Sequence, residues 1–123
     1  MIAADTSSLS SFLLGESGTD IEKIAEAISS GRLVLPPVVV TEILSASKSV
    51  ALARPLLAVQ LLELGDGYWH RAGTNRYLLR QKNLKAKVAD ALIAQSCIDH
   101  DVALITRDTD FRHFAAHCGL KLA

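Results

Sequence analysis

The chain has 123 residues; 50% of them are hydrophobic, 21% are charged, and the formal net charge is zero. This composition excludes a disordered chain, and no apolar run approaches the ~20 residues that a membrane-spanning helix needs. Residues 1–15 also lack the basic start and the small-residue cleavage site of a signal peptide. We therefore expect one cytoplasmic domain over residues 1–123, with a core of its own and no association with a membrane.

Strand and helix patterns alternate along the first half of the chain. Apolar residues between Ile21 and Ile28 have the i, i+3, i+4, i+7 spacing of an amphipathic helix, which Gly31 ends. In chain order we expect a strand over 1–5, a short helix over Leu9, Phe12 and Leu13, a turn over 15–19, a helix over 20–30, a strand over 32–35, and a helix that starts at Pro36-Pro37 and carries Glu42.

The second half continues this alternation. In chain order we expect a polar link over 45–50, a helix over 51–64, a turn over 65–67, a brief strand at Tyr68-Trp69, a helix over 70–83, a buried helix over 87–100, a central strand over 102–105, a short helix over 109–117 and an edge strand over 119–122. Short apolar strands between helices indicate an α/β fold, a three-layer α/β/α sandwich around a central, mostly parallel sheet.

Five carboxylates lie at the ends of segments that should be buried, or beside them. They are Asp5, Glu42, Asp90, Asp108 and Asp110. Burying an unpaired carboxylate is costly, so such groups are usually paired, solvated in a cleft or bound to a cation. Few bases lie close to them in the sequence, Arg107 being the main exception. The pattern therefore favours a divalent cation.

Four motifs follow one another along the chain: Asp5-Thr6-Ser7, Thr41-Glu42-Ile43-Leu44, Asp90-Ala91-Leu92-Ile93-Ala94, and Thr106-Arg107-Asp108-Thr109-Asp110-Phe111. Together with the closing Gly119-Leu120-Lys121-Leu122 they span nearly the whole chain. In this order and spacing they resemble the PIN-domain ribonucleases, and among these the VapC-type toxins of bacterial toxin–antitoxin pairs. The chain departs from that pattern at Lys85-Ala86-Lys87, where relatives often place proline or small residues.

The resemblance implies a PIN-like fold and an endoribonuclease that depends on Mg²⁺ or Mn²⁺. It implies a dimer that a small antitoxin protein holds inactive. Carried over position by position, it implies that Asp5, Asp90 and Asp108 bind the metal, that Glu42 completes the acidic set, and that Asp110 supports it. Thr6 and Thr106 would orient the carboxylates.

Such a set of acids suits the hydrolysis of a phosphodiester bond. Oxygen ligands favour Mg²⁺ or Mn²⁺, and the pair His113 and His117 beside Cys118 lacks the further ligand that a zinc site needs. Our hypothesis is that Asp5, Asp90 and Asp108 hold one or two ions and that a metal-activated water attacks the phosphate. Glu42 would contact a second ion through water or help to deprotonate the nucleophile.

The middle of the chain is basic. Residues 45–87 carry eight bases and two acids (8 − 2 = +6), whereas residues 1–44 carry two bases and six acids (2 − 6 = −4). One interpretation is an RNA-binding track in which Tyr68, Trp69 or Tyr77 stacks on an unpaired base. Its bases would be Arg71, Arg76, Arg80, Lys82, Lys85 and Lys87. The alternative is a solvated helix face with Tyr77 and Leu78 turned to the core.

Other interpretations remain open from the sequence. Asp5 and Asp110 can cap helices, and Asp90 suits a first helical turn whatever its function. The alternative functions are a housekeeping RNA-processing nuclease, an inactive binding module, and a receiver-like signalling domain with an acidic pocket. A phosphatase is less well supported, because no second aspartate lies two residues after Asp5. Residues 51–64 are the candidate dimer face.

Overall fold

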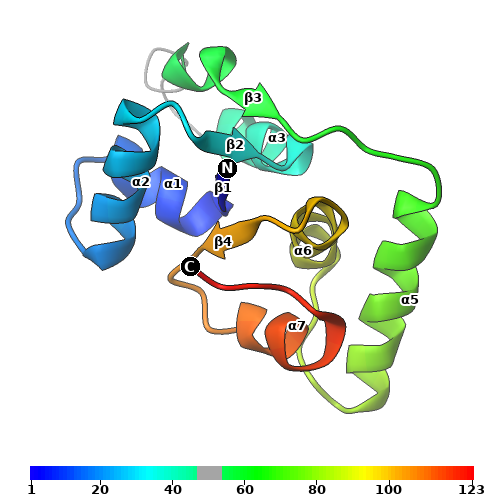
Figure 1. The fold of residues 1–123 in the computed structure, drawn as a ribbon. Helices are drawn as coiled ribbons and strands as arrows, with labels where there is room; N and C mark the ends of the chain where they lie inside the picture. Colours follow the sequence, from blue (N-terminus) through cyan, green and yellow to red (C-terminus); the bar gives the residue numbers. More distant parts are fainter. Residues whose placement is uncertain (47–53) are drawn as a thin grey trace.

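A four-stranded parallel sheet lies at the centre of the protein (Figure 1). The computed structural model describes residues 1–46 and 54–123. The strands are β1 (Ile2–Ala4), β2 (Leu33–Leu35), β3 (Gln60–Leu61) and β4 (Ala103–Ile105), in the order β3-β2-β1-β4. Every pair is parallel, and Ala3 is in register with Val34 on one side and with Leu104 on the other. Parallel neighbours require crossover connections, which the helices between the strands provide.

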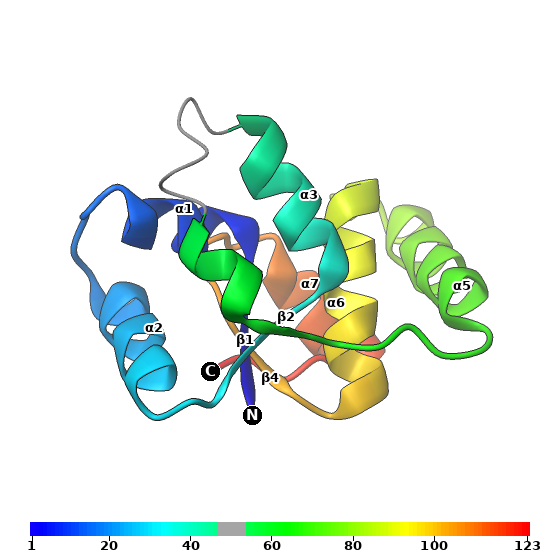
Figure 2. The ribbon, with the colours of Figure 1, turned by 90° about the horizontal axis from the view of Figure 1, so that it is seen from above.

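Helices cover both faces of the sheet. In the described ranges they are α1 (Thr6–Leu13), α2 (Thr19–Ser29), α3 (Pro37–Ala46), α5 (Tyr68–Gln81), α6 (Val88–His100) and α7 (Phe111–Cys118), with a 3-10 helix η1 (Arg54–Ala58). Figures 1 and 2 both place α2 on one side of the sheet and α6 on the other, with α5 outside α6. The predicted three-layer α/β/α arrangement with a parallel sheet is confirmed.

The segment over 51–64 is not the predicted helix in its described part. Residues 51–53 lie outside the described residues; η1 and β3 follow them, and the Leu62 amide donates to the Leu35 carbonyl at 2.9 Å. Leu56 and Leu62 are buried in the protein's own core, whereas Leu61 and Leu64 are exposed, so only part of the apolar character that suggested a dimer face serves the fold. The helical prediction was wrong because the free edge of β2, which recruits β3, exists only in the folded sheet.

Two further boundaries differ from the prediction. Tyr68 and Trp69 form the first turn of α5 rather than a strand, because Gly67, at φ 79°, turns the chain into the helix just before them. At the other end, Leu122 forms only an isolated parallel bridge with Leu104. The prediction that 102–105 is central is therefore only partly right, because β4 ends the four-strand order with this single bridge beyond it.

The core positions the ends of β1 and β4 side by side. Leu104 and Ile105 on β4 are buried beside Ala3 and Ala4 on β1, and the Asp5 amide donates to the Ile105 carbonyl at 3.1 Å. The residues directly after the two strands therefore emerge at the same edge of the sheet, where functional groups of parallel α/β folds collect.

None of the helices in the described ranges combines the length and the apolar character that crossing a membrane requires.

Candidate metal centre

Three aspartates from two separate elements meet at this edge. Asp90 lies in the first turn of α6, and Asp108 and Asp110 lie between β4 and α7. One carboxylate oxygen from each lies within 4.8 Å of the others. In residues 1–46 and 54–123 this is the only group of three or more His, Cys, Asp or Glu side chains close enough to share a metal ion. The imidazoles of His113 and His117 form no such group there.

The loop that carries Asp108 and Asp110 is held by its own side chains. The Asp108 amide donates to Thr106 Oγ1 at 3.0 Å, and the Asp110 amide donates to Asp108 Oδ1 at 2.9 Å. Such bonds from a backbone amide to a side chain two residues earlier stabilise a tight turn. Asp110 occupies the N-cap position of α7, as one interpretation predicted, but its side chain makes no cap hydrogen bond.

Asp90 is in the most unfavourable electrostatic position of the three. Burial, and then the charge of Asp108, raises the pKa of Asp90 to about 6; Lys87 opposes this rise, and Asp110 and Glu42 add to it. The Asp90 Oδ2 atom is buried and has no hydrogen-bond partner among the described residues. Buried polar atoms are rarely left without a partner. A cation in contact with this oxygen would remove the penalty, so the donor set fits a metal ion.

Asp5 lies outside this group but is connected to it. It is 2% exposed, and its carboxylate accepts hydrogen bonds from Ser7 Oγ at 2.8 Å and from the Ser8 amide at 2.9 Å, which makes it the N-cap of α1. Thr106 Oγ1 also donates to Asp5 Oδ2 at 2.5 Å. Burial raises the pKa of Asp5, and these hydrogen bonds oppose the rise. Thr106 therefore connects Asp5 to the Asp108 loop, because its hydroxyl group bonds to the Asp5 carboxylate and to the Asp108 amide.

Glu42 approaches the same region from α3. Its Oε1 atom accepts a hydrogen bond from Thr6 Oγ1 at 2.6 Å, and no lysine pairs with it among the described residues. Its charge contributes to the raised pKa of Asp90, so the two carboxylates act on each other. The structure therefore brings Glu42 into the electrostatic field of the aspartates.

Arg107, the base closest to the acids in sequence, is turned away from them. Its Nε donates to Asp20 Oδ2 at 2.7 Å, its Nη2 donates to Asp20 Oδ1 at 3.1 Å, and its Nη1 donates to Glu16 at 3.3 Å. Hydrogen bonding by Arg107 lowers the pKa of Asp20 to about 2. Sequence reasoning missed Asp20, and no local signal could have found it, because 87 positions separate it from Arg107. This pairing leaves the acid group free of Arg107.

Lys85 is the described cation that contacts the acid group. Its Nζ lies 3.6 Å from Asp110 Oδ2, and both side chains are partly exposed. An exposed pair of this kind is weak, so Lys85 does not neutralise the group. The departure from the family pattern thus places a positive charge at the rim of the acids.

The predicted RNA track divides into paired and unpaired bases. Arg71 forms two hydrogen bonds with Asp99, Nε to Oδ1 at 3.0 Å and Nη2 to Oδ2 at 2.7 Å, which fasten α5 to α6. In the described ranges Arg80 has no carboxylate partner. Tyr77 is 65% exposed and Leu78 is 38% exposed, so the alternative in which both face the core is wrong.

In the described residues the protein is an α/β fold with an all-parallel sheet, and its aspartates gather at the edge where β1 and β4 end. The PIN-domain family model matches residues 2–117, and the chain belongs to the PIN-domain family.

Solved structures agree in fold. VapBC2 from Rickettsia felis, bound to a DNA fragment from their promoter, is similar over all of this chain and 98% of that chain, with a TM-score of 0.79 and 20% identity. FitAcB from Neisseria gonorrhoeae is similar over 99% of this chain and 96% of that chain, with a TM-score of 0.71 and 16% identity. No curated protein sequence matches the chain significantly.

Proposed function

We propose that this chain is an endoribonuclease that depends on Mg²⁺ or Mn²⁺ and is the toxin of a type II toxin–antitoxin pair. The observation that carries the proposal is Asp90: a carboxylate oxygen that is buried, has no hydrogen-bond partner in the described chain, and lies beside two further aspartates. A protein gains nothing in stability from such a group, which favours a function that uses it.

The donor atoms favour a hard divalent cation, since the group offers carboxylate oxygens only. Asp90, Asp108 and Asp110 are close enough to hold it together. The resemblance instead implies Asp5, Asp90 and Asp108 as the metal ligands, with Glu42 completing the acidic set and Asp110 supporting it. When bound, Mg²⁺ or Mn²⁺ supplies an activated water and neutralises charge on the phosphate.

The remaining residues orient this set. Thr106 ties Asp5 to the amide of Asp108, so the positions of β1 and the β4–α7 loop depend on each other. Thr6 holds Glu42 in one orientation, from which the carboxylate can accept a proton from the attacking water. Lys85, at the rim, is placed to attract the phosphate of a substrate.

The toxin role is supported by the four motifs shared with VapC-type toxins and by the likeness of the whole fold to VapBC2 and FitAcB. The partners in this proposal are an antitoxin protein, a second copy of the chain in a homodimer, and an RNA substrate. A housekeeping RNA-processing nuclease would have the same acids and differ in the RNA that it cuts.

Incubation of the purified protein with total RNA and transfer RNA tests the proposal. We expect cleavage with Mn²⁺ or Mg²⁺ and none with a chelator. Induced expression in a bacterial host should stop growth, and co-expression of the antitoxin should restore it. RNA that stays intact with every divalent ion would disprove the nuclease; cleavage without growth arrest would instead support the housekeeping alternative.

Metal binding should also be visible without any RNA. Millimolar Mn²⁺ should raise the melting temperature of chelator-washed protein near neutral pH by up to about 10 °C, because a ligand at 100 times its Kd stabilises by ~2.7 kcal/mol. The shift should shrink as the pH falls below about 6, where protons compete with the metal for Asp90. Differential scanning fluorimetry measures this, with a monovalent salt at matched ionic strength as control. A melting temperature that does not change with Mn²⁺ would show that these aspartates do not form a metal centre.

A further inference from the structure

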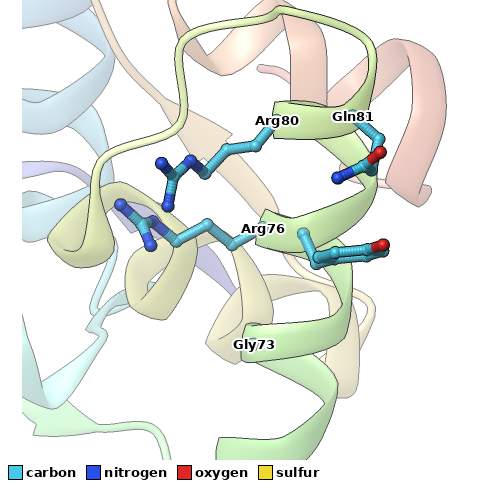
Figure 3. Close-up of a pocket in the computed structure, with 5 residues that line it drawn as sticks. Gly73, Arg76, Arg80 and Gln81 are labelled. Carbon is cyan, nitrogen blue, oxygen red and sulfur yellow. The ribbon is translucent and has the colours of Figure 1, made fainter.

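Helix α5 carries a hollow that the acidic site does not use. It has a volume of about 420 Å³ and is lined by Gly73, Arg76, Tyr77, Arg80 and Gln81 (Figure 3). These positions are spaced along one face of the helix. The volume falls within the ~300–1,000 Å³ that small-ligand pockets occupy.

Two arginines form one wall of this hollow. In Figure 3 Arg76 and Arg80 extend together to one side of the helix, and Gln81 extends to the other. A Cβ built on Gly73 would meet nothing within 4 Å, so the floor is open. No acid lines the hollow. The side chains that line the hollow therefore suit an anionic ligand.

Arg80 is free to take an anion. No carboxylate of residues 1–46 or 54–123 pairs with it, and residues 47–53 contain no Asp or Glu. Arg71, one helix face away, is by contrast occupied by Asp99. Guanidinium groups bind phosphate with two parallel hydrogen bonds, which suits a nucleic-acid backbone better than a single ammonium does.

Tyr77 supplies an exposed aromatic surface to the same hollow. Its ring is 65% exposed although it lies on a helix that packs against α6. An aromatic ring next to arginines is the combination on which proteins stack unpaired bases while they hold the adjoining phosphates. Gln81 adds an amide that can donate to a base edge and accept from it.

The hollow is physically connected to the acids. Arg76 Nε donates to the Ala86 carbonyl at 2.8 Å, which fixes this side chain against the 82–87 segment. The same segment carries Lys87 and also Lys85, whose Nζ lies 3.6 Å from Asp110 Oδ2. Positive charge thus continues from α5 to the rim of the metal centre, as a bound strand requires.

We propose that this hollow is a subsite for one unpaired nucleotide of the RNA substrate, with the base stacked on Tyr77 and the phosphate held by Arg76 and Arg80. The inference rests on the proposed function for the identity of the substrate. It adds that the substrate is single-stranded at this point and that α5, outside the acidic site, selects it.

The test is fluorescence anisotropy of a short labelled oligouridylate in chelator, where no cleavage occurs. Tyr77→Leu should weaken binding about 5-fold or more, with an unchanged salt dependence, because a stacked base is lost. Tyr77→Phe should bind like the wild type. Arg80→Gln should flatten the plot of log affinity against log salt by about 0.7, the contribution of one phosphate on a single strand.

Matched controls lie outside the hollow. Leu14→Ala removes a similarly exposed apolar side chain at the end of α1, and Lys23→Gln removes an exposed charge from α2, across the sheet. A probe of abasic ribose phosphates separates the two contributions, since Tyr77→Leu should no longer matter while Arg80→Gln still does. Tyr77 and Arg80 are exposed, so circular dichroism should show all variants folded.

Any of four results would overturn the subsite. The first is Tyr77→Leu and Arg80→Gln behaving like their controls, and the second is wild type that does not bind the probe. The third is an equal loss for Tyr77→Leu on the abasic probe. The fourth is an oligoglutamate of the same length displacing the RNA as well as unlabelled RNA does, which would make the hollow an acidic-peptide site. Wild-type cleavage is measured separately, so a failed subsite and a failed nuclease are distinguishable.

Discussion

Asparagine in place of Asp90 should abolish metal-dependent RNA cleavage while making the metal-free protein more stable. Loss of residues that merely orient metal ligands already costs about 10–100-fold in metal affinity or activity, so loss of a ligand should cost at least ~100-fold. The asparagine amide keeps the shape of the carboxylate and removes its charge, so any change in cleavage or stability results from the loss of that charge. Cleavage assays with Mn²⁺ measure the first part.

The stability of D90N should depend on pH with a defined sign. The folded-state pKa of Asp90 is about 6, above its ordinary value of 3.8, so the folded protein binds more protons than the unfolded chain between these values. The contribution of Asp90 to the stability of the wild type therefore falls as the pH rises from about 4 to about 6 and then stays level. The ionised carboxyl costs about 1–2 kcal/mol above that window, after discounting the shift for partial solvent exposure.

We expect chelator-treated D90N to melt several degrees above wild type near neutral pH and to match it near pH 4. Mn²⁺ should then no longer raise its melting temperature. Asp66→Asn, at an exposed position away from the acids, is the matched control and should change neither property. If D90N cleaves RNA at the wild-type rate, or if its stability advantage is independent of pH, the role assigned to Asp90 is wrong.

Asp5→Ala should lower the stability of the protein by about 2–4 kcal/mol. The carboxylate caps α1 and accepts bonds from two hydroxyl groups, Ser7 and Thr106, and from one amide. Alanine removes the cap and leaves these donors without a partner in a position that is 2% exposed. Urea denaturation measures the loss, and the melting temperature should fall by roughly 10 °C.

Thr106→Val gives the comparison. It breaks the bond to Asp5 and the bond from the Asp108 amide but leaves the cap in place. In a double-mutant cycle the two changes should be coupled by about 1 kcal/mol, because they share one partly buried hydrogen bond. Additive effects would show that the Asp5–Thr106 contact contributes nothing.

The metal response of Asp5→Ala then separates two roles for this residue. At a temperature where the variant is folded, a retained Mn²⁺ shift assigns Asp5 to holding the loop through Thr106. A lost shift in Asp5→Ala, with the shift retained in Thr106→Val, makes Asp5 a metal ligand as the family motifs imply.

Local patterns were sufficient for most of the architecture. The spacing of apolar residues in 20–30 and the apolar character of 87–100 predicted α2 and α6, and the short apolar runs predicted β1, β2 and β4. Helical and extended geometry repeat at distances that neighbouring residues set, so these patterns are visible in the chain. Parallel pairing followed as well, because every strand is separated from the next by helical sequence.

Pairings between distant residues were not visible in the same way. The apolar pattern of 51–64 predicted a helix, so β3 was missed. The extended conformation is favourable there only because β3 pairs with the edge of β2 in the folded sheet. The contact of Arg107 with Asp20 depends on where α2 packs beside the end of β4, and that of Arg71 with Asp99 on where α5 packs against α6. In the sequence 87 and 28 positions separate the partners. No period or spacing in the chain encodes such distances.

The acidic site combines a part that the sequence predicted with a part that only the folded structure decides. The order of Asp5, Asp90 and Asp108 along the chain, each beside a strand or at a helix start, was enough to single them out. Packing decided which carboxylates lie close enough to share a metal ion: Asp110 joins Asp90 and Asp108, whereas Asp5 is hydrogen-bonded to Thr106 outside this group. Residue types and their spacing are written in one dimension, but the separation of carboxylate oxygens depends on strand register, loop bonds and helix placement, which arise only when the chain folds.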